Sequence, residues 1–165
     1  MRYRIILSLA AGIAALDQSS KFVVERAIAP YETIPVTVFF NLVHVRNYGA
    51  AFGFLNDPDM NWQFWFFLAA TLLAVGIILY IAKQSSEQDK TLFFALGCIL
   101  GGAIGNLLDR IRYRAVTDFL DFHYAGWHWP AFNVADIAIC IGAGLTALLI
   151  WRYPSSGQPG NNSKP

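Results

Sequence analysis

The chain has 165 residues, of which 56% are hydrophobic and only 14% are charged, and its formal net charge is +1. A soluble domain of this size carries about a quarter charged residues, so the composition argues against a soluble globular protein, and the balanced charge argues against a nucleic-acid partner. The sequence predicts an all-α membrane protein with a single polytopic domain over residues 1–153. A disordered tail is predicted over residues 154–165, which are rich in Ser, Gly, Pro and Asn.

The first helix is predicted over residues 3–24. Arg2 and Arg4 precede a 12-residue apolar run, a pattern that also begins cleavable signal peptides. No clear cleavage site followed by a soluble domain is visible, and more hydrophobic segments follow, which favours a retained helix long enough to span a bilayer. Asp17 and Lys21 lie four residues apart near its end, so they share a helix face and can form an ion pair.

Residues 25–61 form the first long connection. Residues 34–45 are rich in Val, Phe, Thr and Ile, which favours strands, and Pro35 is typical of an edge strand. Large apolar residues continue through this connection, so we expect a small extracytoplasmic β-sheet against the membrane surface, between the first and second helices. Residues 34–54 are the candidate cradle or lid over a substrate.

Three further apolar segments predict membrane-spanning helices over residues 62–83, 91–111 and 131–152. Small residues in the second of these segments allow helices to approach one another closely. Cys98 and Cys140 lie inside apolar segments, so we expect inert core residues at both positions and no disulfide framework.

Four spans place both chain termini on the same side of the membrane. The Lys and Arg residues divide almost evenly between the two sides, so the orientation rests on Arg2 and Arg4 beside the first helix, which indicate cytoplasmic termini. The two long connections, residues 25–61 and 109–130, then share the outer face.

Polar residues that are unusual for membrane segments gather at this outer face. A carboxylate within an apolar segment, such as Asp136, is costly in lipid and indicates a functional site by default. The others lie at helix ends or in the two connections: Asp17, Lys21, Asn47, Asn106, Asp109, Arg110, Asp118 and Asn133. Only a few residues below the interface, Asp136 can meet water and still be partly shielded from it.

Two carboxylates that are held near each other cannot both ionise easily, so one of them keeps its proton. Aspartic proteases use this arrangement: the ionised partner takes a proton from water while the other protonates or hydrogen-bonds the scissile carbonyl oxygen. No Ser–His or Cys–His pattern fits better. The histidines His44, His123 and His128 form no HExxH pattern, and zinc-ligand spacing is absent, so we expect no metal.

Other interpretations stay open on the residues alone. Asp109 beside Arg110 fits a structural ion pair or a helix-end feature, and Asp121 fits either a surface charge or a functional group. A small transporter or proton-coupled channel could use Asp136 to bind or relay a cation, although neither inverted repeats nor broken helices are visible. A non-catalytic assembly factor could use the polar face as a docking site.

Four motifs follow one another along nearly the whole chain. They are Asp17-Gln18-x-x-Lys21, Asn47-x-Gly49-x-Ala51-Phe52, Gly105-Asn106-x-x-Asp109-Arg110 followed by Val116-x-Asp118-Phe119, and Phe132-Asn133-x-Ala135-Asp136. In this order they resemble the motifs of the prolipoprotein signal peptidases (signal peptidase II), membrane aspartic proteases of bacteria. One departure is Arg114, where the family usually has Gly. A Gly there could supply a positive-φ turn that Arg adopts less readily.

The resemblance implies an enzyme that cuts the signal peptide from bacterial prolipoproteins, just before the cysteine that carries diacylglycerol. It implies that Asp118 and Asp136 form the catalytic pair, that water is the nucleophile and that no cofactor is needed. It implies substrate-binding or supporting roles at the other family positions, which are Asp17, Lys21, Asn47, Asn106, Asp109, Arg110 and Asn133. We expect a monomer in the bacterial cytoplasmic (inner) membrane, in contact with phospholipids and with its active site near the outer face.

Overall fold

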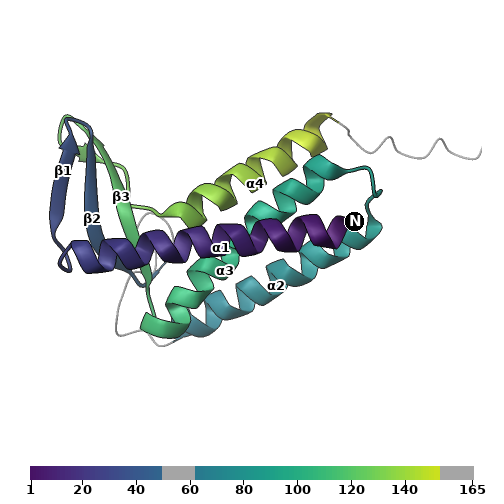
Figure 1. The fold of residues 1–165 in the computed structure, drawn as a ribbon, viewed down its shortest axis with the longest axis horizontal. Helices are drawn as coiled ribbons and strands as arrows, with labels where there is room; N and C mark the ends of the chain where they lie inside the picture. The colour runs from purple at the N-terminus through teal and green to yellow at the C-terminus, as the bar shows by residue number, and fades with distance from the viewer. Residues whose placement is uncertain (50–61, 153–165) are drawn as a thin grey trace, which may run out of the picture.

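The computed structural model describes residues 1–49 and 62–152, which form four long helices with a β-sheet at one end (Figure 1). The helices are α1 (Arg2–Ala27), α2 (Trp62–Gln84), α3 (Lys90–Tyr113) and α4 (Val134–Arg152). The four predicted helices and the sheet beside them are therefore confirmed. The predicted disordered tail and residues 50–54 of the predicted cradle lie outside the described residues.

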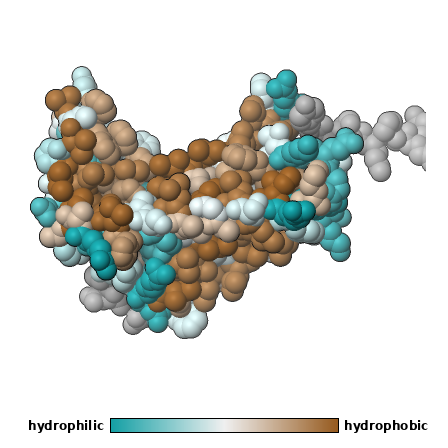
Figure 2. All heavy atoms as spheres, in the orientation of Figure 1, coloured by the Kyte–Doolittle hydropathy of each residue, from teal (hydrophilic) through white to brown (hydrophobic). Residues whose placement is uncertain are grey.

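Three of the helices, α2, α3 and α4, are long and apolar enough to cross a membrane. The first helix differs because polar residues interrupt its apolar run, yet it continues through them as far as Ala27. This is possible because Asp17 and Lys21 are buried inside the protein, where they do not face lipid. In Figure 2, hydrophobic residues cover much of the helical face and hydrophilic residues gather toward its ends.

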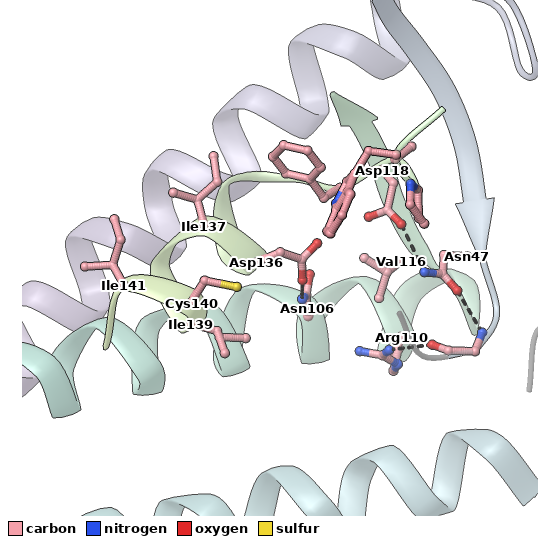
Figure 3. Close-up of a pocket in the computed structure, with 15 residues that line it drawn as sticks. Asn47, Asn106, Arg110, Val116, Asp118, Asp136, Ile137, Ile139, Cys140 and Ile141 are labelled. Carbon is pink, nitrogen blue, oxygen red and sulfur yellow. Dashed lines mark hydrogen bonds between the residues drawn. The ribbon is translucent and has the colours of Figure 1, made fainter. Parts of the chain in front are cut away.

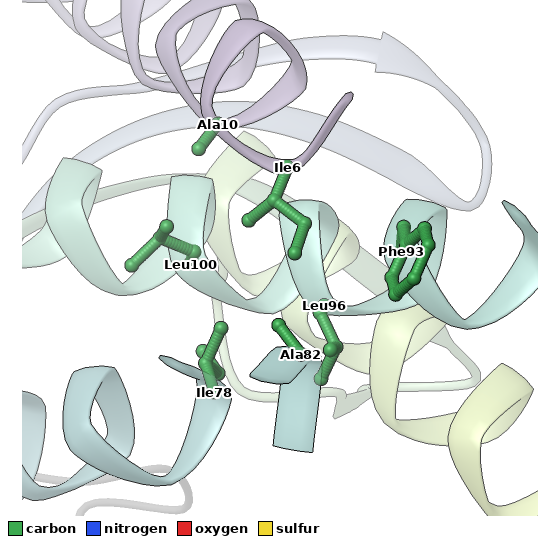
Figure 4. Close-up of a cluster of buried hydrophobic side chains, with 7 residues drawn as sticks. All are labelled: Ile6, Ala10, Ile78, Ala82, Phe93, Leu96 and Leu100. Carbon is green, nitrogen blue, oxygen red and sulfur yellow. The ribbon is translucent and has the colours of Figure 1, made fainter. Parts of the chain in front are cut away.

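The third helix, α3, lies at the centre of the bundle and packs against the other three helices. In its apolar window 56% of the residues are buried, against 6% in α2. Glycines make this central position possible: a Cβ at Gly101 would lie 2.8 Å from the Cβ of Ile13 in α1, and a Cβ at Gly102 would overlap the carbonyl oxygen of Ala135 in α4. Near the chain's N-terminus, α1, α2 and α3 share an apolar cluster (Figure 4) of Ile6, Ala10, Ile78, Ala82, Phe93, Leu96 and Leu100.

The sheet has four antiparallel strands in the order β1 (Thr33–Thr37), β2 (Phe40–Asn47), β3 (Val116–Tyr124) and β4 (Trp127–His128). Pro35 lies in β1 at the edge of the sheet, as its type predicts. Strands are predicted from the sequence only in the first connection, whereas β3 and β4 come from the second. Their acidic residues did not suggest a strand, but in the fold Asp118 and Asp121 are buried and hydrogen-bonded.

The pairing of β2 with β3 brings two candidate site residues together. Leu42 pairs with Leu120, but the next pair is Val45 with Asp118, so β2 contains one extra residue at this point. Such a bulge bends the strand locally. Beyond it, Asn47 pairs with Val116, which places its side chain within diagonal reach of Asp118 on the same strand.

The third helix ends in a left-handed turn at the position where the sequence departs from the family pattern. Arg114 has φ 60° and ψ 6°, and its N–H donates to the carbonyl oxygen of Arg110 at 3.0 Å. The suspected positive-φ turn is therefore present, and Arg adopts it. This helix end leads directly into β3, which carries Asp118.

Candidate active site

Asp118 lies in β3 with a carboxylate that is held by two amides. Asn133 donates to Oδ1 at 2.7 Å and Asn47 donates to Oδ2 at 3.0 Å. The residue is only 3% exposed. Both direct side-chain donors are neutral, so they orient the carboxylate without neutralising its charge.

Asp136 lies in the first turn of α4, where it forms a reciprocal cap with Asn133. The backbone N–H of Asn133 donates to Asp136 Oδ2 at 3.2 Å, and the N–H of Asp136 donates to Asn133 Oδ1 at 3.0 Å. This is the geometry of a capping box, which satisfies two N–H groups at a helix start. Asn106 of α3 donates to Asp136 Oδ1 at 2.8 Å. Asn133 therefore connects the two candidate catalytic carboxylates through one side chain and its own backbone.

Both carboxylates line one cavity of about 560 Å³. Figure 3 shows its polar end, with Asp118 and Asp136 near Asn47, Asn106 and Arg110. The remaining wall is largely apolar and comes from residues 129–132 and one side of α4, including Ile137, Cys140 and Ile141. A cavity of this composition can hold a polar reacting group at one end and apolar substrate groups along the other.

Beside the cavity lies a buried ion cluster centred on Lys21. Its ammonium contacts Asp17 at 2.8 Å, Asp109 at 2.9 Å and Asn106 Oδ1 at 3.0 Å. These three acceptors match the three N–H donors of a lysine. The predicted Asp17–Lys21 ion pair is confirmed. Asp109 also takes part in a structural ion pair, one of the two roles left open for it, and its partner among the described residues is Lys21 and not the adjacent Arg110.

The cluster is attached to the backbone immediately before each candidate catalytic residue. Asp17 accepts the N–H of Ala135 at 3.0 Å, and Asp109 accepts the N–H of Thr117 at 3.0 Å. The next residues along the chain are Asp136 and Asp118. Lys21 thus bridges Asp17 and Asp109. Each of these two carboxylates holds the backbone one residue before a carboxylate that lines the cavity.

Lys21 also determines how the Asn106 amide is turned. Its ammonium and the side-chain amide of Asn133 both donate to Asn106 Oδ1. With its oxygen occupied by donors, the amide presents its NH₂ group to Asp136. The cluster therefore acts on the cavity through Asn106 as well as through the backbone.

The surroundings of Asp118 favour its protonated form. Burial of the side chain and then the nearby negative charge of Asp136 raise the pKa of Asp118 to about 7, against hydrogen bonds from Asn47 and Asn133 and the charge of Lys21, which lower it. A carboxyl group with this pKa can hold a proton or release it close to neutral pH.

Arg110 reaches the cavity from α3. One of its terminal nitrogens donates to the carbonyl oxygen of Gly49 at 3.1 Å, and the side chain lines the cavity. It supplies a positive charge at the polar end, on the side where β2 ends.

The structure divides the nine sequence-predicted site residues into three groups. Five line the cavity, namely Asn47, Asn106, Arg110, Asp118 and Asp136. Asn133 lies fully buried between the two carboxylates, and Asp17, Lys21 and Asp109 form the ion cluster behind it.

Asp121, left open between a surface charge and a functional group, belongs to the sheet. It is 6% exposed and its carboxylate is bound by Asn41 at 2.7 Å and by His128 at 2.9 Å. His128 stacks on His123, with ring centroids 5.0 Å apart. Over residues 1–49 and 62–152, no group of three or more His, Cys, Asp or Glu side chains is placed to hold a metal ion.

Two contributors to the site were not predicted from the sequence. Gln18 donates to Asp109 at 2.8 Å and accepts from Arg112 at 2.6 Å; its place in the first motif could have indicated this role. Cys98 is buried as expected, but Cys140 is exposed and lines the cavity, so its assignment to the core was wrong.

Comparisons with known proteins agree with this arrangement. The family model described as "Signal peptidase (SPase) II" matches residues 9–152. Lipoprotein signal peptidases of Nitratidesulfovibrio vulgaris (strain DP4) and Oleidesulfovibrio alaskensis are 56% and 50% identical to this chain; the matches cover 94% and 92% of it, and 94% and 97% of those relatives. The relative from Yersinia pestis (strain Pestoides F) is 41% identical, with 96% of this chain and 93% of the relative covered.

A solved structure described as a bacterial membrane enzyme has the same fold. It superposes with a TM-score of 0.80 at 25% identity, covering 96% of this chain and 94% of the other. The family model, the relatives and the fold together show that this multi-pass membrane protein belongs to the signal peptidase II family of aspartic peptidases.

Proposed function

We propose that this enzyme removes the signal peptide from diacylglyceryl-modified bacterial prolipoproteins, cutting before the lipidated cysteine, with Asp118 and Asp136 as its catalytic dyad. The observation that carries this proposal is the shared cavity, which has two carboxylates at its polar end and an apolar wall along α4. A lipid-anchored peptide has the matching character, because a polar scissile bond lies next to acyl chains and an apolar signal helix.

The proposed chemistry needs one proton on the dyad. The ionised carboxylate takes a proton from the attacking water, and the protonated one hydrogen-bonds the scissile carbonyl oxygen and protonates it as the bond forms. The raised pKa of Asp118 supports a pair that retains one proton near neutral pH. The reaction uses no cofactor, so activity should persist in a strong chelator.

The remaining family positions support the dyad in this proposal. Asn47, Asn106 and Asn133 orient the two carboxylates through their amides. Asp17, Lys21 and Asp109 fix the chain before each carboxylate. Arg110 binds the substrate at the polar end of the cavity.

We place the enzyme in the bacterial cytoplasmic (inner) membrane, as a monomer among phospholipids, with cytoplasmic termini and the cavity near the outer face. Figure 1 supports this orientation, because the N-terminus and the sheet lie at opposite ends of the helices. Arg2 and Arg4 then lie on the cytoplasmic side. The cavity, at the sheet end, lies where the cleavage site of an exported precursor emerges.

Single substitutions of the dyad test the function. Asp118→Asn and Asp136→Asn should each lower cleavage of a lipidated precursor by at least about 10³-fold, because each removes a proton-transfer group. Both variants should still fold and insert. Asp121→Asn is the matched control, since Asp121 is also buried but does not line the cavity, and it should cleave normally. Near-normal cleavage by either dyad variant would overturn the proposal.

A further inference from the structure

The second helix, α2, contributes no described residue to the cavity wall, yet two of its aromatic side chains contact arginines at the end of α3. The guanidinium of Arg110 lies 4.1 Å from the ring centroid of Phe67, and that of Arg114 lies 4.0 Å from the ring centroid of Phe64. Both distances lie well within the range of cation–π attraction. We call these two contacts the arginine–phenylalanine clasp.

The clasp lies at the end of α2 where few of the described residues are buried. At the opposite end, Ile78 and Ala82 belong to the shared apolar cluster, and Arg2 donates to the carbonyl oxygens of Ala82 and Lys83 at 2.7 and 2.8 Å. Between Trp62 and Ile77, the buried residue is Gln63. One end of α2 is therefore fixed by the core, and the clasp holds the end that lies near the cavity.

At the start of α2, the aromatic side chains that contact arginines are more buried than their neighbours. Phe64 and Phe67 are three residues apart, so they share a helix face, and both are half-buried. Trp65 and Phe66, between them, are exposed at 64% and 50%. The two rings covered by arginines thus face the protein, and the neighbouring rings face outward.

Arg110 couples the clasp to the site. Its guanidinium is held by the ring of Phe67 and by one hydrogen bond to Gly49, and its Nε has no acceptor among the described residues. Among the residues that the structure describes, the ring is thus one of two direct contacts of this guanidinium, which also lies in the field of Asp136, Asp118 and Asp109. Loss of the ring would leave the guanidinium free to turn about its bond to Gly49.

We propose that Phe67 is a positioning residue that holds the Arg110 guanidinium at the cavity, and that Phe64 with Arg114 fixes the adjacent end of α2 so that Phe67 stays in place. The inference rests on the proposed function, because it assigns Arg110 to substrate binding. It also explains a use for Arg114: at this left-handed position Gly would be less strained, but it would lack the cation that covers Phe64.

A graded set of substitutions at Phe67 tests whether its ring positions the Arg110 guanidinium for cleavage. Phe67→Leu keeps an apolar side chain and removes the ring, so kcat/KM for the lipidated precursor should fall about 3- to 30-fold. Phe67→Tyr keeps the ring face and should stay within about twofold of the parent. Tyr80→Leu is the control, because it removes an exposed ring of the same helix at the end away from the clasp, and it should cleave like the parent. Equal rates for Phe67→Leu and Tyr80→Leu, or no rescue by Tyr at position 67, would overturn the proposal.

A distance measurement separates the clasp from the proposed function. Spin labels at Ala69→Cys and Tyr124→Cys, both exposed positions, in a chain that lacks Cys98 and Cys140, report where the outer end of α2 lies relative to the sheet. Arg114→Asn removes the cation while keeping a residue that tolerates the left-handed turn. The distance distribution should broaden in Arg114→Asn, and Phe64→Leu should add nothing further in that background. An unchanged distribution would overturn the clasp, whereas full cleavage by Asp118→Asn or Asp136→Asn would overturn the proposed function instead.

Discussion

Four aspartates at the site divide into two pairs with different surroundings. Asp17 and Asp109 share the ammonium of Lys21, and each also accepts a backbone N–H. Asp118 and Asp136 receive hydrogen bonds from amide and backbone N–H groups and line a cavity. The first pair is balanced in part by an ammonium and closed off from the cavity, whereas the second is held by neutral donors next to a space that can admit substrate.

This difference indicates how buried carboxylates can be sorted into structural and chemical roles. A buried charge without a partner shifts toward its neutral form, whereas a paired charge is stabilised. Asp17 and Asp109, which we call the closed pair, therefore have a structural role: they hold the backbone one residue before each cavity carboxylate. Asp118 and Asp136, which we call the open pair, include a carboxyl group, that of Asp118, that can exchange a proton near neutral pH.

The largest effect is expected from removing the cation of the closed pair. Lys21→Met leaves two buried carboxylates without their ammonium, which should lower the free energy of unfolding in detergent by about 3–5 kcal/mol. A triple variant that combines Lys21→Met with Asp17→Asn and Asp109→Asn removes the uncompensated charge and should recover much of this loss. If the Lys21→Met variant were as stable as the parent, the ion pairs of Lys21 with Asp17 and Asp109 would not be what stabilises this part of the protein.

A smaller loss is expected from crowding the same pair. A Cβ at Gly105 would lie 2.6 Å from Asp17 Oδ2, so Gly105→Ala should push this carboxylate off Lys21 and cost about 1–3 kcal/mol of unfolding free energy. Gly76→Ala is the control, because no atom lies within 4 Å of a Cβ there. Chemical unfolding of the two variants side by side should show a loss only at Gly105.

The smallest effect should appear in the open pair when one amide is removed. The hydrogen bond from Asn47 lowers the pKa of Asp118, so Asn47→Ala should raise that pKa further. The alkaline limb of the pH–rate profile should then move to higher pH, by about 0.5–1 pH unit for one hydrogen bond. Asn41→Ala removes an amide from Asp121 instead and should leave the limb unmoved. A shift to lower pH in Asn47→Ala would contradict this account.

The sequence was enough to predict the helices because long apolar segments have few alternatives in a membrane. The strands of the second connection were harder to predict. Asp118 and Asp121 made residues 116–124 look like a charged loop, and only the fold supplies the amides of Asn133 and Asn41 that allow these carboxylates to be buried in a strand.

Motif order identified the residues of the site, but it could not give their contacts. Nothing in the spacing of Asp109 indicates that Lys21, and not the adjacent Arg110, is its partner, because that choice depends on how α1 packs against α3. The sequence also could not show which face of α4 is exposed to the cavity. The helix is apolar on all sides, so periodicity could not indicate that Cys140 lines a cavity.

The protonation state of Asp118 tests the central claim most directly. Infrared difference spectra recorded against pH should show a protonated carboxyl band that Asp118→Asn removes and that titrates near pH 7, because burial and Asp136 raise this pKa. In Asp136→Asn the neighbouring charge is gone, so the pKa should fall, yet burial should keep it above the ordinary value of 3.8. A band that has vanished by pH 5 in the parent protein, or that titrates at the same pH with and without Asp136, would contradict a proton-sharing pair.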